Sequence, residues 1–584
     1  MKNNHPYEAL IERIKSEIPR KMQEQNIPGL AISIINKKGP IWTEGFGYTD
    51  MTKRRKVDVN TIFSLQSTTK SVTTVGMLLA VQKGLVNLED SIKQFYPEFT
   101  VLSRYGEDQE NKITIRHLLS HSSGLTFEHK LGGVFDNTPC SWEEHIQSIS
   151  GSWLLFPVGS AEHYSNAGMD LSAYLIERIT GQKYVEYIQK EIGDTLGITF
   201  YYNIEQVRKQ ENSVRGYLGQ YEAAPTDDLG LGCGVAYLSI KDLAIFARML
   251  LNLGKIDGKD FLKSELVEEM RNATLDGGYG LGTTVEKQFG TSLPNHAGGG
   301  FGLTSEMFWV PDHDIGIVVM TNQEYQGYSR ELTYKVLSTI LEQKGVSTAS
   351  TKFPYSDKEE IKLNTEKLER FVGRYLASTS NMKLNLKEGK LVLGMAEQEL
   401  IPVSETAFKI KGGEGVRFQL DEQGKPVSMK WYTNSHGVID LLFFGKPHEK
   451  PGPNKREWKQ FEGLYRTSLY SKEVIYDAIK LEKDGYLHFL NSGDVLYEYE
   501  GDPKTFFTII GEAVVFGKGY VYNGNAKSTR VDDIVSEITA LAEKEPKHRH
   551  LQGWILEQIV NGLIYLNRNK EAKKINHIKK KVLE

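Results

Sequence analysis

The sequence of 584 residues has only two cysteines, Cys140 and Cys233, and it lacks any long apolar run. Two distant cysteines cannot build a disulfide framework, so we expect a reducing compartment. No run of about 18 apolar residues is present, so no membrane-spanning helix is predicted. The N-terminal residues contain neither an apolar core segment nor a small-residue cleavage site, so no signal peptide is predicted. We expect a cytoplasmic protein; the alternative is a secreted protein whose leader is missing from the sequence.

The sequence also lacks an excess of either charge and several common functional motifs. Its 71 basic and 75 acidic side chains leave a net charge of −4, which gives no electrostatic footprint for nucleic acid. It contains neither the Gly-x-Ser-x-Gly elbow of an α/β-hydrolase nor the His-Glu-x-x-His motif of a zinc enzyme. The glycines at residues 230–234 lack the strand-then-helix context of a dinucleotide site. We therefore expect no nucleic acid partner and no nucleotide cofactor.

The chain is too long for a single core, and its length suggests three or four domains. A helix is predicted over residues 6–25, followed by two strands joined by a tight turn over residues 29–50. Three sheet strands are predicted over residues 295–322. Strands at both ends with helices between them predict a mixed sheet assembled from both ends of one domain. The helical stretches expected between and after these strands are residues 67–84, 164–190, 235–253 and 328–344.

An internal repeat occupies the second half of the chain, beyond a polar, proline-broken segment at residues 344–364. Short strands recur about every ten residues in this half, with Gly and Asp or Asn turns between them. Two all-β modules of roughly 90 residues, each a small barrel, are predicted. The last segment turns helical and ends in lysines, which indicates a solvated helix face or, as the alternative, a partner-binding surface. The matches, in the same order, are Phe-x-Gly-x-Tyr at 371 and 461, KEGKLVL at 387 with KDGYLHF at 483, and Phe408/Phe418 with Phe506/Phe516.

The pattern Ser-x-x-Lys occurs twice, at Ser67 to Lys70 and at Ser380 to Lys383. The second pair lies in a strand-like stretch, where positions i and i+3 point to opposite faces, so that pair cannot cooperate. The first pair opens a helical stretch that carries no charge between Lys70 and Lys83, which predicts a central and largely buried helix. On a helix, positions i and i+3 share a face, so Ser67 and Lys70 can act together.

The position of Ser67 in the first helical turn suits a nucleophile. Free backbone N–H groups and the helix dipole favour a developing oxyanion there. A lysine in a partly buried, polar site can have a lowered pKa and accept the serine proton. The alternative is an ordinary helix start, with Ser67 as the N-cap and Lys70 as a solvated side chain.

Two further patterns follow in the same domain. Tyr164-x-Asn166 opens another helical stretch, and His296-x-Gly298 is the only His-x-Gly in the chain, on a glycine-rich strand that permits close approach of a ligand. The ordered set Ser-x-x-Lys, Tyr-x-Asn and His-x-Gly resembles the serine β-lactamase/penicillin-recognising hydrolases, on the class C β-lactamase and D-aminopeptidase side. The resemblance covers about residues 15 to 345, and it extends to residues 113–125, 232–254 and 277–282.

The resemblance implies an α+β fold, with an antiparallel sheet flanked by helices in the β-lactamase/DD-peptidase-like manner. The two β modules resemble the C-terminal lipocalin-like barrels of some D-aminopeptidase-like members. The expected domains are a hydrolase domain (1–345), a linker (346–365), a first barrel (366–450), a second barrel (457–530) and a helical tail (531–584).

The family's roles carry over by motif. Ser67 would be the nucleophile that forms an acyl-enzyme, and Lys70 would accept or relay its proton. Tyr164 would be the partner base and would later protonate the leaving group, and Asn166 would hold the substrate amide or Lys70. The oxyanion hole would be the backbone N–H groups of Ser67 and Gly299. The resemblance implies no metal and no other cofactor.

The third motif departs from the family's commonest pattern, which is Lys-Thr/Ser-Gly. Here His296 and Ala297 stand where the lysine and the hydroxyl would help bind a substrate carboxylate, although Gly298 is kept. This favours small esters, amides or short D-amino-acid peptides as substrates over β-lactams and C-terminal D-Ala peptides. The alternatives are a true β-lactamase or D,D-carboxypeptidase, and a non-catalytic binding or scaffold protein. His121 and His163 are predicted to be structural, and no oligomeric state is predicted.

Overall fold

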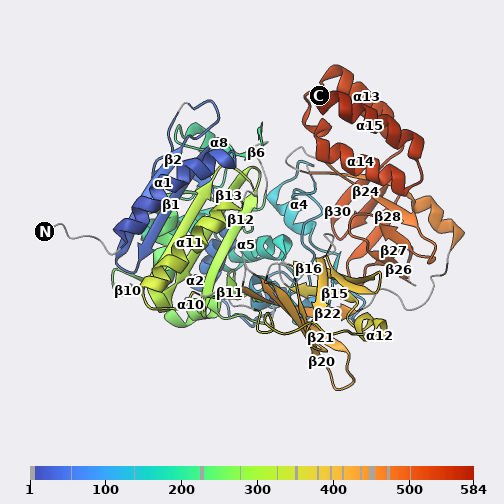
Figure 1. Ribbon diagram of the computed structural model, residues 1–584. Coiled ribbons are helices and arrows are strands. Elements are labelled where there is room, and N and C mark those ends of the chain that lie inside the picture. Colours follow the sequence, from blue (N-terminus) through green and yellow to red (C-terminus); the bar gives the residue numbers. More distant parts are fainter. Residues whose placement is uncertain are drawn as a thin grey trace. The chain divides into compact units, whose positions relative to one another are not determined.

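The computed structural model describes residues 7–583, apart from residues 54, 137, 224–228, 276–277, 325–326, 349–352, 378–379, 395–397, 411–412, 434–436, 446–452, 454, 470–473 and 500–501. The chain folds into two compact units, and Figure 1 traces their elements along the sequence. Within the described residues, no helix has both the length and the apolar character that a bilayer crossing requires. The first unit comprises Met1–Glu98, Glu110–Ser123 and Val158–Phe443, and the second comprises Phe99–Gln109, Gly124–Pro157 and Phe444–Glu584.

A six-stranded antiparallel sheet forms the centre of the first unit, in the order β11-β12-β13-β14-β1-β2. Leu30 of β1 pairs with Thr321 of β14, so strands from early and late parts of the sequence lie side by side. This confirms the predicted α+β fold with a sheet assembled from both ends. The strands are β1 (Gly29–Asn36), β2 (Gly39–Gly47), β11 (Thr284–Gln288), β12 (Thr291–Gly300), β13 (Leu303–Val310) and β14 (Ile315–Thr321).

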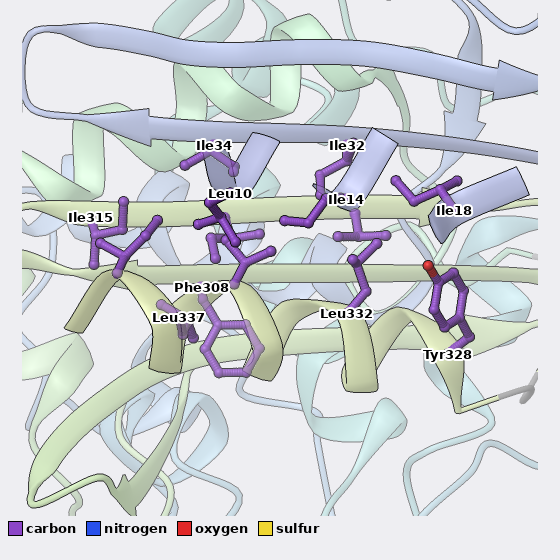
Figure 2. Close-up of a cluster of buried hydrophobic side chains, with 14 of the residues drawn as sticks. Leu10, Ile14, Ile18, Ile32, Ile34, Phe308, Ile315, Tyr328, Leu332 and Leu337 are labelled. Atoms are coloured by element: carbon purple, nitrogen blue, oxygen red, sulfur yellow. The ribbon is translucent and has the colours of Figure 1, made fainter. Parts of the chain in front are cut away.

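One face of this sheet is covered by α1 (Glu8–Glu24) and α11 (Tyr328–Gln343). Figure 2 shows side chains of both helices packed with Ile32 and Ile34 of β1. Burying each Leu or Ile side chain contributes about 1.5–3 kcal/mol, so this cluster anchors the helices to the sheet. Apolar side chains recur every four residues on α1 and therefore share its buried face; they are Leu10, Ile14, Ile18 and Met22.

The other helices of this unit complete the core around the sheet. β1 is buried along its length up to Asn36, so both of its faces need cover, and α9 (Ile240–Leu251) contacts β1, β13 and β14. α2 (Thr69–Gln82) is buried nearly all round and contacts α5 (Asn166–Thr180), as predicted for a central helix. The remaining elements are α3 (Ile115–Leu119), α6 (Tyr184–Ile188), η4 (Gln189–Gly193), α7 (Asp194–Leu196), α8 (Ile204–Lys209), α10 (Ser264–Arg271), β3 (Ile62–Ser64), β6 (Tyr217–Leu218), β7 (Tyr221–Glu222), β9 (Lys255–Ile256) and β10 (Lys259–Asp260).

Three local predictions differ from the structure. The helical stretch 164–190 is interrupted, because Gly181 takes a left-handed conformation (φ 70°) and ends α5. The helical stretch 235–253 begins instead with a strand, β8 (Tyr237–Ser239), which pairs with β3 before α9 starts. The edge strand β11 was not predicted, because its sequence TVEKQ is mainly polar and lacks a strong apolar pattern.

Two closed eight-stranded barrels follow, which confirms the architecture that the internal repeat predicted. A short helix precedes each barrel, α12 (Thr365–Glu369) in the first and the 3₁₀ helix η6 (Arg456–Phe461) in the second. The first barrel consists of β15 (Gly373–Ala377), β16 (Ser380–Lys387), β17 (Lys390–Leu393), β18 (Gln398–Pro402), β19 (Ala407–Lys409), β20 (Gly415–Leu420), β21 (Pro426–Thr433) and β22 (Gly437–Gly445). The second consists of β23 (Gly463–Ser468), β24 (Val474–Leu481), β25 (Leu487–Phe489), β26 (Val495–Tyr499), β27 (Asp502–Phe507), β28 (Ala513–Gly517), β29 (Tyr520–Asn523) and β30 (Ala526–Val531).

The repeated aromatic residues have the same internal arrangement in each barrel. Phe371 stacks on Phe418 with the ring centroids 4.2 Å apart. Phe461 stacks on Phe516, also with the ring centroids 4.2 Å apart. In each Phe-x-Gly-x-Tyr motif the tyrosine hydroxyl donates to the carbonyl oxygen of the phenylalanine, at 3.0 Å in the first barrel and 2.8 Å in the second. The repeat therefore encodes core positions, and these buried side chains pack inside the barrels.

The predicted helical tail is present, and its helices pack on the second barrel. Ile555 and Ile559 of α14 share a buried cluster with Leu464 of β23 and Ala478 of β24. Ile575 of α15 is buried in the same cluster, while most lysines of α15 are exposed. The prediction of a lysine-rich helix face exposed to solvent therefore holds for one side of α15. These elements are α13 (Ile534–Lys544), η7 (Arg549–Leu551), α14 (Gly553–Tyr565) and α15 (Asn569–Leu583).

The second unit also includes two segments from the first third of the sequence. Asn525 lies in the turn between β29 and β30 and is 5% exposed. Its Nδ2 is within hydrogen-bonding distance of Thr126 Oγ1 (3.0 Å), Glu128 O (2.9 Å) and Ser152 Oγ (2.9 Å). The turn of the second barrel is thus hydrogen bonded to the second of these segments, Gly124–Pro157. Their regular elements are β4 (Val101–Leu102), η3 (Gln109–Lys112, which begins there), α4 (Trp142–Gln147) and β5 (Ser152–Trp153).

Candidate active site

The candidate nucleophile lies in a tight turn between a strand and a buried helix. Ser67 belongs to the 3₁₀ helix η1 (Gln66–Thr68), directly before α2, and it is half-buried although the residues on both sides are buried. Gln66 adopts a left-handed φ of 47°, and its side chain donates to Ser64 Oγ at 2.9 Å. A non-glycine residue in this conformation costs about 1–3 kcal/mol, and such strain gathers at functional sites. The turn presents Ser67 while its neighbours stay packed.

Lys70 lies one helical turn beyond the serine and points at it. Its side chain is wholly buried, which excludes the interpretation of a solvated lysine. Nζ donates to Ser67 Oγ at 3.2 Å and to the carbonyl oxygen of Cys233 at 2.8 Å. The same nitrogen lies 4.6 Å from the ring centroid of Tyr164 and hydrogen bonds with the Tyr164 side chain. The structure thus joins the serine, lysine and tyrosine of two separate motifs around one ammonium group.

The surroundings of Lys70 favour its charged form. Burial alone would lower the pKa of Lys70, but the negative charge that Tyr164, Cys233 and Asp170 can carry outweighs burial and raises that pKa above its ordinary value. The sequence led us to expect the opposite direction, because it showed only that the helix was buried. With a raised pKa, Lys70 is an ammonium group at neutral pH, so it acts as a donor and a positive charge.

His121 hydrogen bonds to the residues before and after Tyr164 and so holds this segment in place. The carbonyl oxygen of His121 accepts from the backbone N–H of His163 at 2.8 Å, and its Nδ1 accepts from the backbone N–H of Ser165 at 3.2 Å. The His121 ring also packs against the Tyr164 ring, with centroids 4.4 Å apart. Burial and the charge of Lys70 lower the pKa of His121 well below its ordinary value, so its ring is neutral. His121 thus packs against Tyr164 and binds the backbone on both sides of it; the structural role of His121 and His163 stays a prediction.

The glycine-rich strand β12 lies directly against the turn Gln66–Thr68, which carries the candidate nucleophile Ser67. The hydroxyl of Thr68 donates to the carbonyl oxygen of His296 at 3.2 Å. A Cβ added at Gly298 would lie 2.1 Å from the carbonyl oxygen of Leu65 and 2.6 Å from Ser305 Oγ. Only glycine therefore allows the strand to approach the turn this closely.

The ring of His296 is buried and neutral. Its Nδ1 faces the carbonyl oxygen of Ala297 at 2.7 Å, so Nδ1 carries the proton, and its Nε2 accepts from the Tyr279 hydroxyl at 2.8 Å. Burial first, and then the charge of Lys70, lower the pKa of His296 to about 3. His296 therefore offers no positive charge to a substrate carboxylate at neutral pH.

Asn166 and Gly299 lie on the same elements as the residues above. Asn166 is the first residue of α5 and is 8% exposed; the N-cap of this helix is Ser165, whose Oγ accepts from the N–H of Gly168 at 2.9 Å. Asn166 is therefore not the N-cap of α5. Gly299 follows Gly298 on β12 and pairs with Thr304 of β13.

Three contributors to the site were missed at the sequence level. The strain at Gln66 and the carbonyl of Cys233 have no local sequence signal, because they depend on chain packing. Tyr279 lies within the glycine-rich stretch 277–282, which was identified as part of the family resemblance without a role for any single residue. The other of the two Ser-x-x-Lys pairs begins on strand β16, as predicted; the side chain of Ser380 is outside the described residues.

Parts of this chain are similar to known proteins. Residues 14–341 match the family model described as Beta-lactamase. Penicillin-binding protein 4* of Bacillus subtilis is 26% identical over 421 residues, which cover 65% of this chain and 88% of that protein. An unguisins hydrolase of Aspergillus campestris is 26% identical over 329 residues, covering 53% of this chain and 61% of that protein.

Solved structures share the fold. An octameric penicillin-binding protein homologue from Pyrococcus abyssi superposes with a TM-score of 0.51 at 24% identity, covering 74% of this chain and 98% of that chain. The crystal structure of SurE superposes with a TM-score of 0.55 at 18% identity, covering 75% of this chain and all of that chain. At these identities the likeness concerns the fold alone.

Proposed function

Because the chain belongs to the Beta-lactamase family, we propose that it is a serine acyl hydrolase that forms an acyl-enzyme on Ser67. The observation that carries the proposal is the position of the Lys70 ammonium group, 3.2 Å from Ser67 Oγ and 4.6 Å from the Tyr164 ring centroid. One buried positive charge thus contacts both the nucleophile and its partner base.

In the acylation step Tyr164 is the base. Lys70 stabilises the Tyr164 phenolate, which takes the proton of Ser67 Oγ as that oxygen bonds to the substrate carbonyl carbon. The negative charge moves to the carbonyl oxygen, which the backbone N–H groups of Ser67 and Gly299 receive. Loss of one such donor typically costs about a hundred- to a thousand-fold in rate.

The tetrahedral intermediate then breaks down to the acyl-enzyme. The Tyr164 phenol returns its proton to the leaving nitrogen or oxygen as the bond from that atom to carbon breaks. In deacylation a water molecule gives a proton to Tyr164 and bonds to the acyl carbon, and Ser67 Oγ leaves and recovers the proton. Asn166, at the start of α5, would orient the substrate amide.

The neutral ring of His296 supports substrates that do not need a cation on β12. We propose small esters, amides or short D-amino-acid peptides as substrates. A relative named an unguisins hydrolase supports hydrolysis as the reaction class. The second candidate is a β-lactamase or D,D-carboxypeptidase, which the match to penicillin-binding protein 4* favours. Rapid nitrocefin turnover would support the second candidate.

The test is the intact mass of the protein after exposure to a fluorophosphonate probe. Wild type should gain one adduct, Ser67→Ala none, and Ser380→Ala one. Ser380→Ala is the matched control because it belongs to the other Ser-x-x-Lys pair. Equal labelling of wild type and Ser67→Ala would contradict the mechanism, and no adduct on wild type would favour a non-catalytic binding protein.

A further inference from the structure

The carbonyl oxygen that receives Lys70 belongs to a loop. Cys233 lies in the turn at residues 230–234, outside any helix or strand, and its carbonyl accepts from Lys70 Nζ at 2.8 Å. This bond can orient the ammonium group only if the carbonyl itself is held in place. The loop therefore needs support from a neighbouring element.

Asp170 on α5 provides that support. One carboxylate oxygen, Oδ1, accepts from the backbone N–H of Gly232 at 2.7 Å and from the backbone N–H of Cys233 at 2.9 Å. The Asp170 side chain is 0% exposed. Two charge-assisted bonds from consecutive residues to a single oxygen restrict the rotation of the peptide between them and the direction of the next carbonyl.

The loop is also pressed directly onto α5 and tied to α2. A Cβ added at Gly232 would lie 2.4 Å from the carbonyl oxygen of Met169, so only glycine lets the loop come this close to the helix. From the opposite side, Thr73 Oγ1 of α2 donates to the carbonyl oxygen of Gly232 at 2.7 Å. The loop is therefore held between the helix that follows Ser67 and the helix that follows Tyr164.

A purely structural role for Asp170 makes a different prediction from a role in positioning. An uncharged acceptor of the same shape, such as asparagine, could receive the same two N–H groups at a smaller desolvation cost than a buried carboxylate. A negative charge at residue 170 is therefore expected only if it has an electrostatic partner. Lys70 is such a partner, because Asp170 is one of the groups that raise the pKa of Lys70.

We propose that Asp170 is a positioning residue that fixes the Gly232 to Cys233 peptide, so that the Cys233 carbonyl holds the Lys70 ammonium group against Ser67. The inference rests on the proposed serine acyl hydrolase function. Asp170 does not touch the reacting atoms; it acts through the loop and through its charge.

The test compares wild type, Asp170→Asn, Asp170→Ala and Ser172→Ala. Ser172 is the matched control, since it lies on the same helix, is equally buried, and its hydroxyl donates within α5, to the carbonyl oxygen of Gly168. The measurements are the second-order rate of fluorophosphonate labelling as a function of pH, the melting temperature, and the distance from Cys233 O to Lys70 Nζ in crystals of each variant.

Asp170→Asn should label about tenfold more slowly. The fall of its labelling rate on the alkaline side should also begin at a lower pH than in wild type, because Lys70 loses a nearby negative charge. Asp170→Ala should label about a hundredfold more slowly, with the Cys233 to Lys70 distance longer than 2.8 Å, since small misplacements have effects of this size. Ser172→Ala should behave as wild type. If Asp170→Ala does not fold, Asp170→Asn decides.

The proposal would be overturned if the folded Asp170 variants behaved as wild type does. They would then show the same labelling rate, the same pH profile and the same distance from Cys233 O to Lys70 Nζ. Failure of the proposed function looks different: wild type is then unlabelled, or Ser67→Ala is labelled equally. In that case the crystals still decide the positioning role, because an unchanged distance in Asp170→Ala contradicts it and a displaced carbonyl supports it.

Discussion

The hydroxyl of Tyr279 donates to Nε2 of His296 at 2.8 Å and fixes the imidazole as a neutral ring with both nitrogens engaged. By the family resemblance, His296 and Ala297 stand at the positions where a lysine and a hydroxyl would be expected to bind a substrate carboxylate. Ser67, Lys70 and Tyr164 therefore lie in close contact, whereas the His296 ring supplies no positive charge on β12 at neutral pH.

The first prediction concerns substrate charge. For substrates matched except for a carboxylate on the leaving side, kcat/KM should be at least about tenfold higher for the neutral one, a difference of about 1.4 kcal/mol in transition-state binding. His296→Lys should reduce this difference in kcat/KM between the two substrates, because it adds a cation on β12. A preference of wild type for the carboxylate substrate would instead support the D,D-carboxypeptidase alternative.

The second prediction concerns acid stability. The pKa of His296 is lowered to about 3 in the folded protein, whereas it is about 6.5 in the unfolded chain. Protons therefore bind the unfolded chain more tightly, and the free energy of unfolding decreases as the pH falls from 6.5 toward 3. Each pH unit in this window removes about 1.4 kcal/mol. Relative to His296→Gln, wild type should lose about 2 kcal/mol of unfolding free energy between pH 7 and pH 5 in urea titrations. His577→Gln, on an exposed part of α15, should keep the wild-type dependence.

The third prediction concerns the charge of Lys70. Lys70→Met should slow fluorophosphonate labelling by about a hundred- to ten-thousand-fold, because Ser67 and Tyr164 lose their shared ammonium group. Stability should also fall, because the raised pKa of Lys70 shows that its charge is net stabilising in the folded protein, and the substitution leaves the Cys233 carbonyl without this donor. Lys83→Met, at the other end of α2, is the control and should label normally.

The pH dependence gives a separate check on Lys70. Because its folded pKa is raised, the charge and its stabilising effect are fully present below the ordinary lysine value of about 10.4 and are lost only as pH rises through the higher folded value. No loss of labelling from Lys70 is expected between pH 7 and pH 10. A decline that begins near pH 8 and disappears in Lys70→Met would contradict this.

The fourth prediction concerns the contact between β12 and the nucleophile turn. Gly298→Ala should abolish labelling and destabilise the protein by about 1–3 kcal/mol, because the new methyl group would overlap the carbonyl oxygen of Leu65. Gly234→Ala is the control, because a Cβ there meets nothing within 4 Å. Labelling rate and melting temperature measure both effects, and normal labelling of Gly298→Ala would show that the strand can move away.

The fifth prediction concerns the second unit. Asn525→Ala should lower the free energy of unfolding by about 1–3 kcal/mol, because it leaves the buried oxygens of Thr126, Glu128 and Ser152 without this donor. Asn523→Ala, two residues earlier, should be nearly neutral, because its buried Oδ1 has no hydrogen-bond partner among the residues that the structure describes. Equal effects of the two substitutions on denaturant unfolding would count against the assigned role of Asn525.

Local patterns predicted the regular elements well. The helix predicted over residues 6–25 is present at Glu8–Glu24. The strands predicted on either side of the Pro-Asp turn at Pro311 are present at Leu303–Val310 and Ile315–Thr321. The Phe-x-Gly-x-Tyr repeats gave two barrels because the same side chains build both interiors. In contrast, β11 is held by its pairing with β12, and its own sequence carries little signal.

The candidate site was predictable in part. The ordered motifs named Ser67, Lys70, Tyr164 and His296, and the structure places their side chains near one another. The direction of the Lys70 pKa was not predictable, because it depends on groups that are close only after folding, such as Asp170. The roles assigned to these residues, the domain limits and the cytoplasmic location stay predictions.

The turn that carries Asn525 has a consequence for shortening the chain. Removing the residues after Phe443 would leave Gly124–Pro157 in place but would strip it of the core it shares with the second barrel, including the edge-to-face contact of Trp153 with Phe507. The shortened protein would expose apolar surface at Trp153 and should aggregate or be cleaved by proteases between Gly124 and Pro157. The part that carries Ser67 is therefore not a piece that can be expressed alone, even though its motifs end before the barrels begin.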